Sequence, residues 1–168
     1  MTSNSATEHS TATLWADEHF TDICQAPLPR GLRERASGLS WDGFLAAFGH
    51  SAGPLRLGRW ECTDTPRPSR CLGPQVRNYQ ATLAVGEQIS TSHAAASGPI
   101  AALTAMLYDR GIAVEMLNFH QRQMGRDTVT FIRGTDGIGD EWAMGWAEDA
   151  TQSALRAMVA VANRLATR

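Results

Sequence analysis

The sequence predicts an α+β fold of two pseudo-symmetric units, each with three strands and then a helix, after a short helical subdomain. The first observation is a change of period near the C-terminus. Bulky and small residues alternate over residues 142–146, as in a strand, and apolar residues recur every three or four positions from Ala154 to Leu165, as in a helix. The second observation is the same order of patterns over residues 79–108. We therefore expect sheets backed by two helices.

The strands are predicted from period-two patterns bounded by turn residues. Gly86 separates two such patterns, as in a hairpin. Five of the six strands are predicted in this way, over residues 79–85, 87–93, 112–120, 128–133 and 142–146.

The first of the two helices is expected at residues 100–108. Pro99 suits a first helical turn, and Ser97 or Gly98 can cap the helix just before it. Gly111 can end the helix, because glycine readily adopts the left-handed backbone that helix ends require.

The chain divides into three segments. Residues 1–26 are predicted to be a flexible N-terminal segment, residues 27–53 a helical linker-like subdomain, and residues 54–168 the pair of repeats. A helix capped by Ser40 places Trp41, Phe44, Leu45 and Phe48 on one apolar face. That face must be buried against the core of the repeats, a second subunit or another protein. Residues 63–74 are rich in proline and predict an exposed loop.

Composition excludes several classes of function. The 168 residues carry a net charge of −2, which gives no reason to expect a nucleic-acid partner. We find neither a secretory signal nor an apolar run long enough to cross a membrane, so a cytoplasmic protein is expected. The three cysteines and five histidines show no metal-ligand spacing, and neither a metal nor a cofactor is predicted.

Two motifs resemble a known family. Residues 97–102 read SGPIAA, and the final helix contains QSALRAMV at residues 152–159 and ANR at residues 162–164. Both resemble the C-terminal regulatory domain of α-isopropylmalate synthases, in which a glycine-proline turn opens a small apolar helix and the closing helix commonly ends in asparagine-arginine. A weaker resemblance reaches back to residue 27 and to the linker subdomain of that family.

The resemblance does not include the catalytic half of the family. That half is an eight-stranded α/β barrel, a fold that takes about 250 residues. The present chain has 168 residues and no His-x-His metal motif. We therefore expect no isopropylmalate synthase activity from this chain alone.

The resemblance also implies a ligand site formed by the two strand-to-helix turns near a dimer interface. Unpaired N–H groups at a helix start favour a carboxylate, so a small carboxylate ligand is expected. The predicted ligand-binding residues are Ser97, Gly98, Pro99, Ile100, Ala101, Asn118, Ala147, Glu148, Asp149 and Ala150. This chain departs from the family at residues 94–96, which are alanines instead of glycines, and at Asn118 and Gln121, which are amides instead of acids. Leucine specificity is therefore not implied.

Three functions remain open from the sequence. The first is a stand-alone regulatory module that binds a small amino acid or keto acid, forms a homodimer and acts on a separate synthase in trans. The second is an enzyme of specialised metabolism that reuses the effector pocket, with His93, His120, Glu148 and Asp149 as acid-base candidates. The third is a structural partner of another protein. The homodimer is also expected because the apolar stripe of the last helix is wider than one sheet face needs. That stripe comprises Ala154, Leu155, Met158, Val159, Val161 and Ala162.

Overall fold

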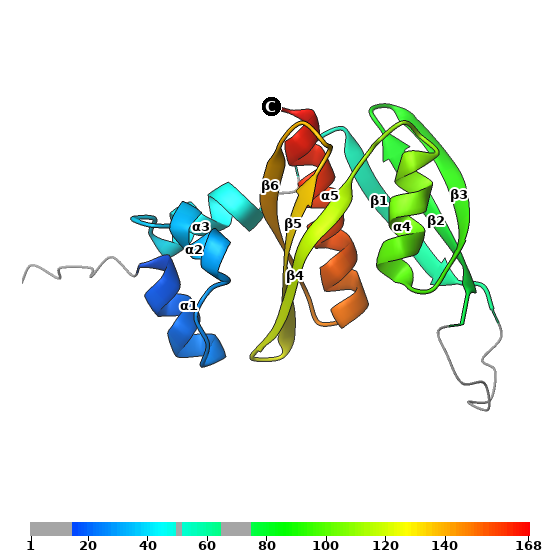
Figure 1. The fold of residues 1–168 in the computed structure, drawn as a ribbon. Helices are drawn as coiled ribbons and strands as arrows, with labels where there is room; N and C mark the ends of the chain where they lie inside the picture. The colour runs from blue at the N-terminus through cyan, green and yellow to red at the C-terminus, as the bar shows by residue number, and fades with distance from the viewer. Residues whose placement is uncertain (1–14, 50–51, 65–74) are drawn as a thin grey trace, which may run out of the picture.

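The computed structural model describes residues 15–49, 52–64 and 75–168, and it confirms the predicted α+β fold (Figure 1). Two three-stranded antiparallel sheets each lead into a helix, and short helices precede them. The first unit comprises β1 (Leu55–Cys62), β2 (Arg77–Val85), β3 (Gln88–Ala96) and α4 (Pro99–Tyr108). The second comprises β4 (Glu115–Met124), β5 (Asp127–Thr135), β6 (Asp140–Ala147) and α5 (Ala150–Ala166).

The strands follow one another in space as they do along the chain. The sheet orders are β1-β2-β3 and β4-β5-β6, so the middle strand of each sheet pairs with both neighbours. Gly86 joins β2 to β3 with φ +60°, and Gly125 joins β4 to β5 with φ +65°. These are left-handed conformations that glycine adopts without steric cost. The predicted hairpin at Gly86 is confirmed.

The main core lies between the two sheets, where α5 packs beside α4 (Figure 1). Leu83 of β2, Leu103 and Met106 of α4, and Leu155 and Met158 of α5 are all fully buried in it. Burial of a side chain of this size contributes about 1.5–3 kcal/mol relative to exposure. Both units therefore share one hydrophobic core.

The apolar stripe of α5 is buried within the chain. Its six residues are at most 5% exposed. Strands β5 and β6 cover one side of α5, and β1 and α4 contact the other. Because both sides are covered, the width of the stripe does not require a second subunit. The inference of a homodimer from this helix is wrong, and the homodimer itself stays a prediction.

Bulky and small residues alternate along β6 because helices pack against both faces of its sheet. Trp142 and Met144 are 3% and 4% exposed and belong to a second core with the N-terminal helices. Ala143 and Gly145 face α5, and a Cβ on Gly145 would overlap the backbone of Ser153 and Ala157. Bulk on one face and a glycine on the other thus let helices pack closely on both sides of the sheet.

The N-terminal helices cover the face of the β4–β6 sheet that is opposite α5. They are α1 (Ala16–Cys24), α2 (Arg30–Arg35) and α3 (Trp41–Phe44), and α3 continues into the π-helical turn η1 (Leu45–Gly49). Ser40 caps α3 as predicted, since its hydroxyl accepts a hydrogen bond from the Gly43 N–H at 3.2 Å. The rings of Phe20 and Phe44 lie 5.3 and 6.4 Å from that of Phe131. Of the three surroundings considered for the aromatic face, the core of the repeats is the one observed.

The N-terminal boundary differs from the prediction of a flexible segment up to residue 26. Helix α1 begins at Ala16 because Ala16 and Phe20 find apolar partners in the second core. The prediction for residues 1–14 and most of the predicted loop at 63–74 lie outside the described residues. No helix in the described part of the chain is both long and apolar enough to span a membrane.

Candidate functional site

The predicted ligand-binding residues lie in three separate places in the folded structure. The turn at residues 97–101 lines a groove beside α4. Asn118 lines a pocket against α2, and Ala147, Glu148 and Asp149 line a surface pocket beside β6. A single chain therefore does not bring the two strand-to-helix turns into one pocket.

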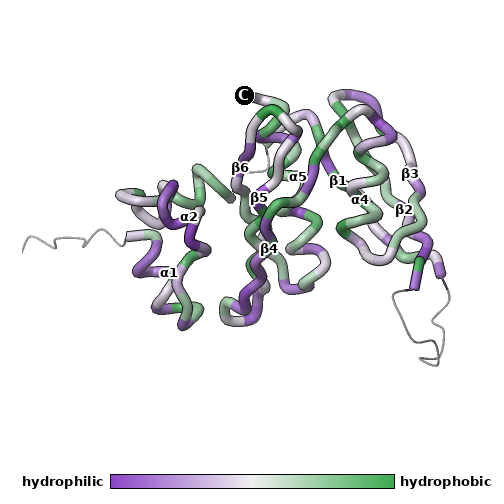
Figure 2. The backbone as a smooth tube through the Cα atoms, in the orientation of Figure 1, coloured by the Kyte–Doolittle hydropathy of each residue, from purple (hydrophilic) through white to green (hydrophobic). Residues whose placement is uncertain are grey.

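The groove beside α4, called here the α4 groove, has a volume of about 750 Å³. It runs from the turn at 97–101 to Ala113–Met116 at the start of β4, and Figure 1 shows β4 starting near the far end of α4. The helix between them is coloured mostly as hydrophobic in Figure 2. Tyr108 and Met116 are 73% and 44% exposed. The charged residues among its described lining, Asp109 and Glu115, are both acidic.

The start of α4 offers backbone donors to this groove. Pro99 takes the first helical position, and the first backbone bond of the helix runs from the Ala102 N–H to the Gly98 carbonyl at 3.0 Å. The N–H groups of Ile100 and Ala101 come before that bond and have no acceptor within the helix. They favour an anion because they lie at the positive end of the helix dipole.

The cap of α4 is Gly98, and Ser97 does not form it. No side-chain hydrogen bond caps this helix. Gly98 has φ −172°, an extended conformation open to any residue, and a Cβ on it would meet nothing within 4 Å. A side chain at residue 98 would therefore meet neither backbone strain nor a clash at its Cβ.

The alanines at residues 94–96 continue β3. Ala94 and Ala96 pack against the main core, and Ala95 is exposed on the other face of the strand. Among the described residues, the non-glycine position with positive φ is Gln25. Alanine fits at 94–96 because the backbone there is extended.

The second strand-to-helix turn, at residues 147–151 between β6 and α5, has a structural role. Asp149 caps α5, and its Oδ1 accepts from the Gln152 N–H at 2.7 Å. Ala150 opens the helix, and its carbonyl accepts a hydrogen bond from the Gln121 side chain at 2.9 Å. Gln121 also donates to Thr130 Oγ1 at 2.9 Å. An ionised glutamate could not make the bond to the Ala150 carbonyl because it has no proton to donate, so the amide at 121 joins β4 to α5.

The acid-base candidates are not assembled into one site. His93 is exposed on β3 opposite Gln80, in the first sheet. His120 lines the pocket against α2, where its ring stacks on Trp142 with centroids 6.1 Å apart. Glu148 and Asp149 line the pocket beside β6. Within the described ranges, no three His, Cys, Asp or Glu residues gather as a metal site would need.

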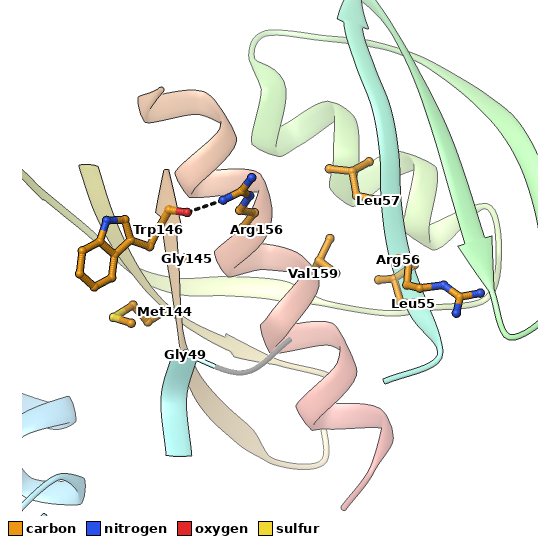
Figure 3. Close-up of a pocket in the computed structure, with 9 residues that line it drawn as sticks. All are labelled: Gly49, Leu55, Arg56, Leu57, Met144, Gly145, Trp146, Arg156 and Val159. Carbon is orange, nitrogen blue, oxygen red and sulfur yellow. Dashed lines mark hydrogen bonds between the residues drawn. The ribbon is translucent and has the colours of Figure 1, made fainter. Parts of the chain in front are cut away.

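A further cavity was not predicted from the sequence. It lies where β1 of the first unit faces β6 and α5 of the second, and we call it the inter-unit cavity (Figure 3). Its volume is about 440 Å³. Its described lining residues are Gly49, Leu55, Arg56, Leu57, Met144, Gly145, Trp146, Arg156 and Val159. They come from η1, β1, β6 and α5, so no single local motif predicts the cavity.

An ion-pair cluster joins the N-terminal helices to the second unit. Asp140 accepts hydrogen bonds from Arg133 and from Arg35 of α2, both at 2.8 Å. The bond from Arg133 is the main cause that lowers the pKa of Asp140. The backbone N–H groups of Gly139 and Ile138, with Arg168, lower the pKa of the nearby Asp136 to about 2. The cluster holds the fold at the start of β6, and its Arg133 also lines the pocket against α2.

Comparison with known proteins confirms the resemblance noted in the sequence. No protein-family model matches the chain. It is 29% identical over 113 residues to the 2-isopropylmalate synthases of Clavibacter sepedonicus and of Clavibacter michiganensis subsp. michiganensis. Each match covers 65% of this chain and 19% of the relative, so the chain spans about a fifth of the length of these relatives. The chain is thus similar to one region of the 2-isopropylmalate synthases, with the share expected of a regulatory domain without the catalytic barrel.

Proposed function

We propose that the chain is an effector-binding domain that binds a small amino acid or keto acid, forms a homodimer and regulates a synthase in trans. One observation carries this proposal. The turn at residues 97–101, identified by its resemblance to the regulatory domain, lines the α4 groove and begins a helix whose first N–H groups have no acceptor within the helix. The similarity to 2-isopropylmalate synthases supports the same function.

The chemistry of the α4 groove suits an amino acid. A carboxylate can accept from the N–H groups of Ile100 and Ala101, while an aliphatic side chain lies on the apolar surface of α4. Asp109 and Glu115 add negative charge to the lining. They favour a ligand whose carboxylate is accompanied by an ammonium group, because a purely anionic ligand would be repelled.

The homodimer is supported by exposed apolar residues beside this groove. Met116, Leu117 and Phe119 of β4 are 44%, 48% and 41% exposed. Strand β4 is also an edge of its sheet, so half of its backbone groups lack a strand partner. A second copy placed on this edge would cover the apolar residues and close the groove. Sedimentation at tens of micromolar tests this, and a monomer there would contradict it.

The test of ligand binding is Gly98→Val. The new side chain would stand at the helix start, where the carboxylate must approach the backbone, and its Cβ would meet nothing within 4 Å in the fold. Calorimetric titration with leucine is expected to show binding to the parent and none to Gly98→Val. Ala95→Val is the matched control, because Ala95 is exposed on the face of β3 that points away from the main core, so the same bulk is added there. Equal affinity of a correctly folded Gly98→Val, judged by circular dichroism, would remove the ligand from this turn.

A further inference from the structure

The pocket against α2 lies where one row of side chains on the β4–β6 sheet meets the start of that helix. The register pairs Asn118 with Arg133 and Arg133 with Trp142, so the three side chains stand side by side on the face that carries the N-terminal helices. A Cβ on Gly31 would lie 3.5 Å from the Trp142 ring, which places the start of α2 over this row. The described lining is completed by Arg30, Glu34 and His120.

Arg133 is held in this pocket with most of its donors unused. Its Nε donates to Asp140 Oδ2 at 2.8 Å, and this bond fixes the orientation of the planar guanidinium. In the described part of the chain, neither Nη1 nor Nη2 of Arg133 donates a hydrogen bond. These two groups carry four of the five N–H donors of an arginine, and their spacing matches two oxygens of a carboxylate or a phosphate. Arg133 is therefore prepared to hold an oxyanion.

Further donors surround the same space. The Asn118 amide can donate two N–H groups, and the His120 imidazole can donate at least one. Within the described ranges, neither of these side chains has a hydrogen-bond partner. The His120 ring stacks on Trp142 with centroids 6.1 Å apart, which positions it at the wall of the pocket. Donors on β4, β5 and α2 approach from several directions, and this arrangement suits a tetrahedral phosphate better than a flat carboxylate.

The charges of the pocket also favour an anion. Its described lining contains two arginines and one carboxylate, that of Glu34. Glu34 lies 3.6 Å from Arg30 Nε, and these side chains are 70% and 94% exposed. An exposed pair of this kind contributes little stability, so Arg30 can turn towards a ligand. Asp140, which binds Arg133, also pairs with Arg35 at 2.8 Å, so its charge is shared between two cations.

We propose that the pocket against α2 binds the phosphate group of a small phosphorylated metabolite, with the phosphate on Arg133, Asn118 and Arg30. The volume of about 530 Å³ lies within the range of about 300–1,000 Å³ that is usual for small-molecule sites, so the body that carries the phosphate also has room. The bound phosphate would join α2 to β4 and β5. This site shares no described lining residue with the α4 groove and does not depend on a ligand there.

The first test is calorimetric titration with inorganic phosphate and with glycerol 3-phosphate, in a phosphate-free buffer kept at constant ionic strength with chloride. Arg30→Gln is expected to weaken the binding of both by about tenfold to a hundredfold, the usual loss for a hydrogen-bonded charge. Arg122→Gln is the matched control. It removes the same charge from the same face of β4, and Arg122 is outside the described lining, so the affinity should not change.

The second test is Asn118→Asp, which keeps the shape of the side chain and adds a carboxylate opposite Arg133. The new carboxylate would pair with the guanidinium and repel the phosphate, so binding should be lost. Gln88→Glu adds the same charge to β3 in the first sheet and should leave the affinity unchanged. In the parent, hydrogen exchange of α2 should slow when glycerol 3-phosphate is added, while that of β3 stays constant.

Several results would overturn the proposal. Undetectable binding of both phosphate compounds to the parent is one. Equal losses in Arg30→Gln and Arg122→Gln would show general attraction to positive charge instead of a site. Undiminished affinity in folded Asn118→Asp would place the phosphate elsewhere, and glycerol 3-phosphate binding more weakly than inorganic phosphate would exclude the metabolite. Gly98→Val should leave phosphate binding intact, so a failure of ligand binding in the α4 groove is distinguishable from a failure here.

Discussion

Asn163 offers the sharpest test of how the two units are joined. Its Oδ1 accepts from the Leu55 N–H and its Nδ2 donates to the Leu55 carbonyl, both at 2.8 Å. Asn163 and Leu55 are 1% and 2% exposed. The side-chain amide thus replaces a strand partner at the start of β1. Gly53 allows this approach, because a Cβ there would overlap the Asn163 side chain.

Asn163→Leu keeps the approximate volume and removes both hydrogen bonds. The Leu55 N–H and carbonyl then remain buried without these partners, at about 1–3 kcal/mol each. We therefore expect the free energy of unfolding to fall by about 2–6 kcal/mol, a large part of the total of about 5–15 kcal/mol that is typical of a domain. Asn163→Asp keeps the acceptor, loses the donor and buries a charge, so at neutral pH it should be at least as harmful.

The assay is urea denaturation followed by circular dichroism, together with hydrogen exchange at the Leu55 amide. Asn78→Leu is the control, because Asn78 donates to Asp64 at an exposed site, and its change should stay within about 1 kcal/mol. The reasoning would be refuted if Asn163→Leu lost less than about 1 kcal/mol. It would also be refuted if Leu55 exchange were no faster in that variant than in Asn78→Leu.

Three further predictions concern stability and activity. Gly145→Ala should lower the free energy of unfolding by about 1–3 kcal/mol or more, because its Cβ would overlap the backbone of α5. Gly98→Ala, with free space around its Cβ, is the control and should change little in the same urea titration. Asp136 has its pKa lowered to about 2 from 3.8, so its contribution to stability is present above about pH 4 and is lost as the pH falls towards 2. The urea midpoint of Asp136→Asn should therefore fall less than that of the parent between pH 5 and pH 2, and identical pH curves would contradict this assignment. Finally, the purified 168-residue chain should not condense acetyl-CoA with 2-oxoisovalerate; any turnover would show that the barrel is not needed.

The local elements could be predicted from the sequence because their causes are local. The period of the apolar residues indicated β6 and α5, glycine marked the turn at Gly86, and the glycine-proline pair marked the start of α4. Residues 97–101 were singled out by the resemblance as one part of a ligand site; the structure shows that they line a groove, and their role in binding stays a prediction. The assignment of the cap to Ser97 or Gly98 needed the structure, because either residue can precede a proline at the first helical position.

Which part of the molecule covers each apolar face could not be predicted from such local patterns. A stripe on α5 and an aromatic face on α3 show that something apolar must cover them, and a second subunit satisfies that demand as well as the same chain does. The structure places β1 and α4 on the far side of α5 and the N-terminal helices on the bulky face of β6. The second turn was likewise ambiguous, because Asp149 suits a helix cap as well as a ligand site.

The sequence alone determined the two βββα units, their turns, and the resemblance to one region of the isopropylmalate synthases. These depend on periodicity and short motifs, whose physical causes act within a few residues. Only the tertiary structure decided that α5 is buried within the chain, that Asn163 joins α5 to β1, and that Arg156 borders a cavity between the units. Such contacts join residues as much as 108 positions apart. They exist only because packing of the shared core brings the two sheets together.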